Sequence, residues 1–387
     1  MKRKPLHFGI IGGGLMGREI ASAFARWCHL LELPVRPVLR GVASGRESSL
    51  TWFKDNFDTL TTTTTDYRDL LASTEIEAVY VAVPHQLHES IYTDCLRAGK
   101  HLFGEKPFGI DAGANDTIAS AAASNPTAIV RCVSQFPFYP GAQAVYKCAA
   151  AGQCGRILEV EVGFLHSSDL NPDKPGNWKR QNATNGLYGC MGDLGLHVLH
   201  IPLRLGWKPA NVRSVLTKIY TERPDGRGGR MVCDTWDNAT LLCDVPTDCG
   251  NFPLTVKTHR IAPGEKNTWY IKVIGTKRGM IFSTKEPRTL RSFEYRSGAE
   301  QAWATQDIGY DSLYRTVTGG IFEFGFSDAI LQMLASFCDR VHQGPDHRLP
   351  FDCATLQETR DHHAILTAAL VSQENAITAP VHYRSDV

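Results

Sequence analysis

The chain has 387 residues, of which 43% are hydrophobic and 21% are charged, and its formal net charge is +1. That length is enough for two domains, and the composition is ordinary for a globular protein. The near-neutral charge gives no electrostatic case for nucleic-acid or membrane-surface partners. Since the sequence contains neither a run of about 18 apolar residues nor a signal-peptide pattern, we expect a cytoplasmic protein.

A glycine-rich turn follows the first apolar segment. Residues 6–11 read as a strand, residues 12–17 have the sequence GGGLMG, and residues 18–27 carry apolar side chains at helical spacing. A strand, GxGxxG and a helix in this order form the dinucleotide fingerprint, in which the helix N-terminus receives the phosphates. The predicted phosphate-binding residues are Gly12, Gly14, Leu15, Met16 and Gly17.

The end of the second predicted strand, residues 37–43, leaves the choice of nicotinamide cofactor open. NAD sites commonly place an acidic residue here to bind the ribose hydroxyls. This chain has Ser44 and Arg46 instead. Both could hold the 2′-phosphate of NADP; equally, Ser44 alone could touch the ribose while Arg46 is solvated. We therefore expect NAD, with NADP as the alternative.

Strands and helices alternate through the rest of the first third of the chain, which predicts a parallel sheet. Side chains that follow strands in such a sheet meet at one edge, where ligands bind. Two segments qualify: Pro84 to His88 after an apolar strand, and Glu105-Lys106 after the next one. The expected elements are an extended segment 61–65, a helix 67–71, a strand 78–83, a helix 89–98, a strand 100–103 and a strand 129–133.

Short strands separated by turn residues dominate the second part, which predicts a largely antiparallel sheet. The expected strands are 157–164, 212–220, 238–243, 254–258, 269–274 and 279–283, with helices 139–151, 322–341 and 356–371. We predict a dinucleotide-binding Rossmann domain over residues 1–133 and an α+β substrate and oligomerisation domain over residues 134–387. The eleven cysteines show no paired CxxC spacing, and no group of residues has metal-ligand spacing, so we expect reduced thiols and no metal.

Three motifs in this order resemble the glucose–fructose oxidoreductase / inositol dehydrogenase (Gfo/Idh/MocA) family. They are the glycine turn at 12–17, Glu105-Lys106-Pro107, and the run from Gly189 through Asp193 to His197. The resemblance implies a large, mostly antiparallel open sheet in the second domain, which commonly serves for assembly, so we expect a homo-oligomer, a dimer or a tetramer. It also implies a sugar-like small-molecule substrate.

The same resemblance assigns roles to individual residues. Lys106 lies near the nicotinamide and the substrate hydroxyl, with Asp193 and His197 completing the catalytic group. Glu105 lies beside the ribose, and Pro84 and His88 lie along the nicotinamide. Trp178 and Arg180, with Lys179 between them, are similar to a Trp-Arg pair that reaches toward cofactor or substrate.

Physical chemistry supports these roles. On one helix, Asp193 and His197 would share a face, about 6 Å apart along the axis. A histidine that titrates near neutrality could take the hydroxyl proton, and Lys106 could stabilise the alkoxide. Lys179 and Arg180 could hold an anionic substituent, or belong to a solvated loop. Tyr139 could line the same cleft, or form core.

Three functions are compatible with this pattern. The leading hypothesis is a nicotinamide-dependent oxidoreductase acting on a secondary hydroxyl of a sugar, cyclitol or anionic sugar derivative. The first alternative is an NAD-dependent glycosidase that oxidises, eliminates and re-reduces a charged glycoside. The second is a non-enzymatic cofactor-binding regulator.

Overall fold

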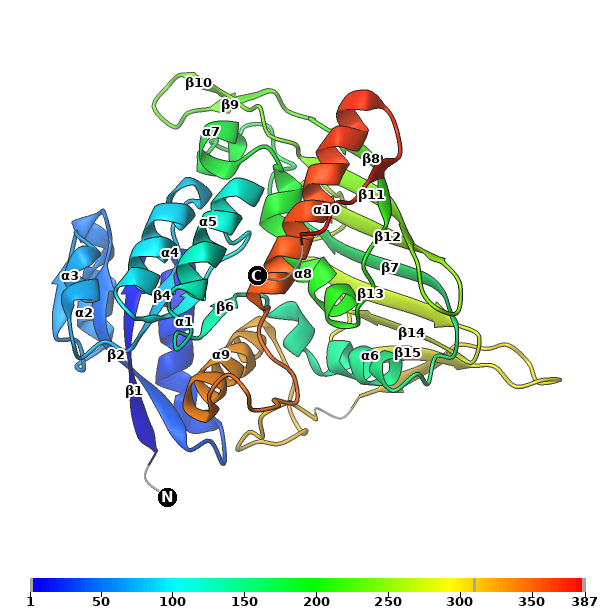
Figure 1. The fold of residues 1–387 in the computed structure, drawn as a ribbon, viewed down its shortest axis with the longest axis horizontal. Helices are drawn as coiled ribbons and strands as arrows, with labels where there is room; N and C mark the ends of the chain where they lie inside the picture. The colour runs from blue at the N-terminus through cyan, green and yellow to red at the C-terminus, as the bar shows by residue number, and fades with distance from the viewer. Residues whose placement is uncertain (1–2, 309–310, 385–387) are drawn as a thin grey trace.

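The first of two large sheets consists of six parallel strands. The computed structural model describes residues 3–308 and 311–384, and it sets the two sheets on either side of a central group of helices (Figure 1). The first sheet has the order β3-β2-β1-β4-β5-β6. Its strands are β1 (Lys4–Ile11), β2 (Val35–Ala43), β3 (Thr62–Thr64), β4 (Ala78–Val81), β5 (His101–Gly104) and β6 (Val130–Cys132).

Helices cover both faces of this sheet, so its central strand β4 is apolar throughout, whereas β2 nearer the edge alternates buried and more exposed residues. All four residues of β4 are buried. The helices are α1 (Leu15–Ala25), α2 (Thr51–Asn56), α3 (Arg68–Ala72), α4 (His88–Arg97) and α5 (Ala112–Ala123), with 3-10 turns η1 (Arg26–His29), η2 (Glu47–Ser49) and η3 (His85–Leu87). This arrangement confirms the predicted Rossmann architecture.

The second sheet has nine strands, and all its pairings are antiparallel except that of β12 with β7. The predicted large, mostly antiparallel sheet is therefore confirmed. In sheet order the strands are β16 (Ala304–Asp307), β15 (Thr289–Glu294), β14 (Arg278–Ser283), β13 (Thr268–Gly275), β7 (Ile157–Leu165), β12 (Phe252–His259), β11 (Asn238–Val245), β8 (Asn211–Thr217) and β17 (Ala379–Pro380). A separate hairpin pairs β9 (Glu222–Pro224) with β10 (Arg230–Val232).

The remaining helices tie the two sheets together. They are α6 (Pro140–Ala150), α7 (Asn182–Asn185), α8 (Cys190–Arg204), α9 (Phe326–Gln343) and α10 (Leu356–Asn375), with 3-10 turns η4 (Phe136–Phe138) and η5 (Trp178–Arg180). Helix α8 packs on the inner face of the second sheet, and α10 contacts both α5 and β8, so both lie between the sheets in Figure 1. Helix α9 packs against α1 and β2 of the first sheet. The closing helices thus cross the predicted division at residue 133.

Several elements differ from the sequence-based expectations. Helix α5 was not expected, because its alanine-rich sequence gives little apolar periodicity. Helix α9 begins at Phe326 rather than at residue 322, since the Asp328 carboxylate accepts a hydrogen bond from the backbone N–H of Gly325 and caps the helix there. Within the described ranges, no helix combines the length and apolar character needed to cross a membrane.

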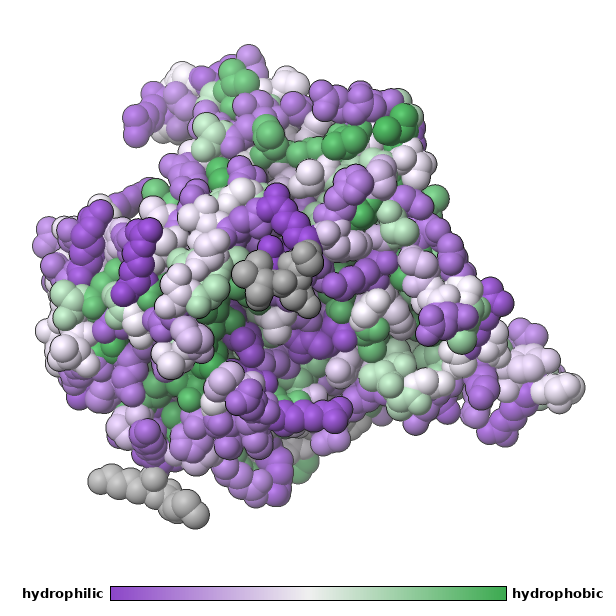
Figure 2. Space-filling view, in the orientation of Figure 1, coloured by the Kyte–Doolittle hydropathy of each residue, from purple (hydrophilic) through white to green (hydrophobic). Residues whose placement is uncertain are grey.

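The outer face of the second sheet is open. Val215 on β8 and Leu242 on β11 point outward and are 60% and 53% exposed. Nearby, Lys257 pairs with Glu161 and Lys272 pairs with Glu159 across the strands. The face seen in Figure 2, by contrast, is mostly hydrophilic, with apolar side chains scattered among polar ones. The charges on this face are paired within the chain, so its exposed apolar side chains make it the candidate surface for the expected contact with a second copy.

We predict that arginine at both Val215 and Leu242 lowers the solution mass from that of an oligomer to that of one chain, because buried unpaired charges oppose association. Light scattering after size-exclusion chromatography measures this mass. Val232→Arg is the matched control, since Val232 is 62% exposed but lies on β10, outside the sheet. An unchanged mass in the double variant would exclude this face as the interface.

Candidate active site

The glycine-rich turn between β1 and α1 has the geometry of a phosphate cradle. Gly12 has φ +112°, and a Cβ atom there would collide with the carbonyl oxygen of Ala82; one at Gly17 would collide with the carbonyl oxygen of Gly12. Gly14, in contrast, faces open space, with no atom within 4 Å of where its Cβ would be. Helix α1 begins directly after Gly14 without a side-chain cap. These features fit a pyrophosphate approaching the backbone of Gly14 and the free N–H groups of α1.

The other predicted cofactor contacts lie around this turn. The side chain of Leu15 is 81% exposed, and Met16 packs partly against the core. Ser44 lies directly beside Gly13, whereas Arg46 is exposed in the loop after β2. The two side chains predicted to contact the ribose or a 2′-phosphate thus differ in position, Ser44 against the glycine turn and Arg46 in solvent.

The segment carrying Lys106 is held by its backbone. The Tyr92 hydroxyl donates to the carbonyl of Glu105 at 2.7 Å, and Asn115 donates to the carbonyl of Phe108 at 2.8 Å. The His363 ring lies 2.9 Å from the carbonyl of Pro107. These three side chains come from α4, α5 and α10, so elements of both halves of the chain fix the position of Lys106 at the carboxyl end of β5.

Helix α8 supplies the second part of the site. It starts at Gly189, where φ is +57° and a Cβ atom would press on the backbone of Trp236, so the close approach requires glycine. Asp193 and His197 lie one turn apart on this helix, as the sequence predicts, and both are 3% exposed.

The Asp193 carboxylate is the centre of a charged cluster. Lys106 Nζ donates to Asp193 Oδ1 and to the Asp193 carbonyl, both at 2.6 Å. Lys179 Nζ lies 2.9 Å from Oδ1 and 3.0 Å from Oδ2, and Arg260 Nη2 lies 3.4 Å from Oδ2. Burial alone would raise the pKa of Asp193, but the three cations hold it well below its ordinary value, so the carboxylate is ionised.

Arg260 was missed by the sequence analysis. It directly follows β12, is fully buried, and also donates to the carbonyls of Lys179 and Gly189. Arg260 therefore ties the η5 turn to the start of α8. Its position after a predicted strand was the only signal in the sequence. Nothing in the motif around Asp193 indicated that Arg260 would contact it.

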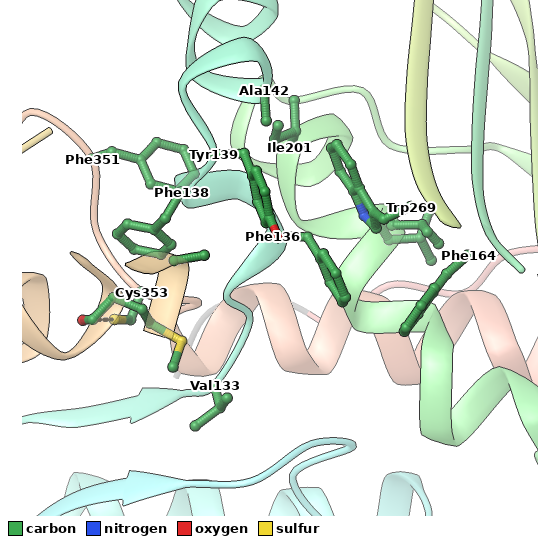
Figure 3. Close-up of a cluster of buried hydrophobic side chains, with 14 of the residues drawn as sticks. Val133, Phe136, Phe138, Tyr139, Ala142, Phe164, Ile201, Trp269, Phe351 and Cys353 are labelled. Carbon is green, nitrogen blue, oxygen red and sulfur yellow. Dashed lines mark hydrogen bonds between the residues drawn. The ribbon is translucent and has the colours of Figure 1, made fainter. Parts of the chain in front are cut away.

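The environment of His197 corrects one expectation. Its ring lies edge-on to Phe136 and Phe164, at 5.2 and 5.6 Å between centroids, and the Trp269 indole donates to its backbone carbonyl at 2.7 Å. Figure 3 shows Phe136, Phe164 and Trp269 gathered in this aromatic cluster. Burial, followed by the charge of Lys106, holds the pKa of His197 well below its ordinary value. His197 is consequently neutral at physiological pH instead of titrating there.

Two histidines and a tryptophan lie at the end of β4. The His85 ring is edge-on to Trp178 at 4.8 Å, and its Nδ1 lies 2.9 Å from the carbonyl of Asn185. His88 is fully buried and stacked on Tyr92 at 4.7 Å, next to the half-buried Pro84. His85 was not among the predicted site residues, although it stands between two that were, and it brings Trp178 against the end of the first sheet.

The predicted substrate and ribose contacts fall in different surroundings. Lys179 joins the Asp193 cluster, whereas the adjacent Arg180 is buried and paired with Asp169. Both cations already have carboxylate partners, which a substrate anion would have to displace. Tyr139 is 5% exposed with its ring against Phe324, in the aromatic core of Figure 3. The Glu105 carboxylate accepts a hydrogen bond from the Tyr80 hydroxyl at 2.7 Å in the interior.

Cysteines and metal ligands take no part in the site as described. All eleven cysteines are free thiols, and burial raises the pKa of Cys190, beside the cluster, to about 12, which makes it unreactive. Within residues 3–308 and 311–384, no group of three or more His, Cys, Asp or Glu side chains is arranged to hold a metal ion.

Comparison with known proteins identifies both halves of the chain. Residues 6–131 match the family described as "Oxidoreductase family, NAD-binding Rossmann fold", and residues 142–281 match the "GFO/IDH/MocA C-terminal domain". Levoglucosan dehydrogenase from Pseudarthrobacter phenanthrenivorans is 27% identical over 83% of this chain and 82% of its own length. Trans-1,2-dihydrobenzene-1,2-diol dehydrogenase from Sus scrofa is 25% identical over 59% of this chain and 68% of its own.

Solved structures share the fold. Levoglucosan dehydrogenase in complex with NADH and levoglucosan superimposes with a TM-score of 0.86, covering 98% of this chain and 100% of that one at 21% identity. An inositol dehydrogenase homolog from Azotobacter vinelandii, complexed with NAD+, gives a TM-score of 0.76 over 97% of this chain and 98% of that one, at 18% identity.

We predict that Gly14→Val weakens NAD binding at least about 10-fold while leaving the melting temperature near that of the wild type. The φ of Gly14 is −78° and its surroundings are open, so the fold tolerates a side chain that the pyrophosphate does not. Calorimetric titration and thermal unfolding measure the two effects. Gly17→Val is the contrasting variant and should destabilise the fold itself. Normal NAD affinity in Gly14→Val would place the phosphates elsewhere.

Proposed function

We propose that this chain, which belongs to the oxidoreductase family with an NAD-binding Rossmann fold and a GFO/IDH/MocA C-terminal domain, oxidises a secondary hydroxyl of a sugar or cyclitol. The observation that carries the proposal is the contact between Lys106, at the end of β5, and Asp193, on α8. This contact places a buried charged cluster at the carboxyl edge of the first sheet. The glycine turn lies at the same edge, directly after β1. Oxidation of an alcohol needs this combination of cofactor and proton-handling groups.

Each side chain of the site has a separate role in the proposed reaction. Lys106 donates a hydrogen bond to the substrate oxygen and stabilises the negative charge that develops on it. Asp193 holds Lys106 in place and balances its charge. His197 is neutral and positions the hydroxyl by hydrogen bonding, and Trp178 offers an aromatic surface to the sugar ring. The bound nicotinamide supplies the hydride chemistry.

Several features support this choice of substrate and cofactor. The named relatives are dehydrogenases of levoglucosan and of a cyclic diol, and an inositol 2-dehydrogenase from Burkholderia multivorans is 31% identical over 27% of this chain. Each of these names denotes a ring that bears hydroxyl groups. The match to an NAD-binding Rossmann family and the NADH and NAD+ complexes of its structural relatives support NAD as the cofactor. Because Lys179 and Arg180 are both paired, a neutral substrate fits the cluster without breaking an ion pair.

Lys106→Ala should lower turnover at least about 100-fold, the usual scale for lost charge stabilisation or proton transfer. NADH formation, followed by absorbance with a panel of cyclic polyols, measures this rate. Lys208→Ala is the control, because Lys208 pairs with Asp361 outside the site.

The products separate the proposed reaction from its alternatives. One NADH per ketone formed supports the dehydrogenase. Cleavage of a chromogenic glycoside without net NADH would indicate the redox-neutral glycosidase instead. NAD binding without turnover of either kind would indicate a cofactor-binding regulator.

A further inference from the structure

Two lysines share the oxygen atom of one carboxylate in the proposed site. Lys106 Nζ and Lys179 Nζ both bind Asp193 Oδ1, at 2.6 and 2.9 Å. These two distances add to 5.5 Å, so the nitrogens cannot lie further apart than that. With any smaller separation, a hydroxyl oxygen that approaches from the side opposite Oδ1 can hydrogen-bond to both nitrogens, since such bonds measure about 2.8 Å.

The two lysines differ in what surrounds them. Lys106 has two acceptors on the same residue, the carbonyl and the carboxylate of Asp193, and its side chain is 14% exposed. Lys179 contacts both oxygens of the Asp193 carboxylate, which Lys106 and Arg260 also engage, and its Nζ lies 5.5 Å from the centre of the Trp178 ring; its side chain is 33% exposed. Lys179 is therefore the lysine nearer to solvent, and its contacts are to side chains alone, whereas Lys106 is also held by a backbone carbonyl.

We propose that Lys179 is the general base of the oxidation, taking the hydroxyl proton of the substrate and passing it to water. The proposal rests on the dehydrogenase function proposed above. The substrate O–H bond breaks and the proton moves to the neutral Nζ of Lys179. The oxygen electron pair forms the C=O bond as the electron pair of the C–H bond leaves with its hydrogen to oxidised nicotinamide. Lys106 keeps its charge and faces the developing alkoxide.

Burial is the main reason that the pKa of Lys179 lies below the ordinary value of a lysine. The cations Lys106 and Arg260 lower this pKa further, while Asp193 opposes them. The titratable and charged groups facing Lys179 from neighbouring elements are Glu105, Lys106, His166, Asp193, His197 and Arg260. Transfer of the hydroxyl proton to Lys179 leaves the net charge of the cluster unchanged, because the lysine gains a positive charge as the substrate oxygen gains a negative one.

The histidine of the site is poorly suited to the same task. The pKa of His197 lies well below its ordinary value, so a proton placed on its ring would be strongly disfavoured. His197 is also 3% exposed, among aromatic rings, so it has no direct route for releasing a proton to water. The pKa of Lys179 is lowered from the much higher ordinary value of a lysine, and its side chain is 33% exposed, so it can both take up the hydroxyl proton and release it to water.

Lys179→Arg tests the assignment, because a guanidinium retains the charge and the hydrogen bonds but cannot give up a proton at ordinary pH. The expected result is a fall in kcat of at least about 100-fold with unchanged NAD affinity and melting temperature. In the wild type, kcat should rise with pH as Lys179 loses its proton, and this rise should be absent from the variant. Lys174→Arg is the control, since Lys174 precedes η5 and pairs with Asp169 instead.

Chemical rescue separates a base from a structural contact. In Lys179→Ala, added methylamine should raise kcat at least about 10-fold above that of the variant alone. The size of this increase should depend on the basicity of the amine that is added. Normal kcat in Lys179→Arg, or a pH-dependent rise that persists in it, would overturn the assignment. So would Lys179→Ala activity that no amine improves. If the wild type oxidises no polyol at all, the proposed function itself fails; if it does and these variants behave normally, only the role of Lys179 fails.

Discussion

The buried carboxylate of Asp193 is the constraint on which the structure of the site depends. A carboxylate that is 5% exposed is stable as an anion only when cations and hydrogen bonds replace the water it has lost. Lys106, Lys179 and Arg260 do so from three separate elements: the end of β5, the η5 turn and the end of β12. Removing one member of such a buried network commonly costs about 3–5 kcal/mol, since it leaves the others without balance.

This network also determines how the two halves of the chain meet. Lys106 follows β5 of the parallel sheet and Asp193 lies on α8 of the second half, so their contact joins the carboxyl edge of the first sheet to α8. The closing helices reinforce the junction: His363 on α10 contacts the carbonyl of Pro107, and the Cys132 amide donates to the carbonyl of Ala354 at 2.8 Å. The glycine turn and the charged cluster of the proposed site thus lie on elements that are packed against each other.

Sequence reasoning succeeded where the signal is contiguous. The glycine turn, the β5 position of Lys106 and the α8 spacing of Asp193 and His197 each depend on a few neighbouring residues and on regular backbone geometry. It failed where tertiary packing decides: Arg260 reaches the cluster from a distant strand, α9 crosses to the first sheet, and aromatic burial removes the near-neutral titration expected of His197. The carboxylate partners of Lys179 and Arg180 could not be predicted from the sequence either. The two side chains are adjacent on a 3-10 turn and pair with different carboxylates, Asp193 and Asp169.

A structure of the protein with NAD and a bound cyclic polyol would test the central claim most directly. The account predicts one substrate hydroxyl oxygen within about 3.2 Å of Lys106 Nζ and of Lys179 Nζ, with Asp193 still bound to both lysines. The carbon that bears this hydroxyl should lie about 3–3.5 Å from the nicotinamide ring. A polyol bound with its hydroxyls away from both lysines, while the Asp193 cluster remains intact, would contradict the account.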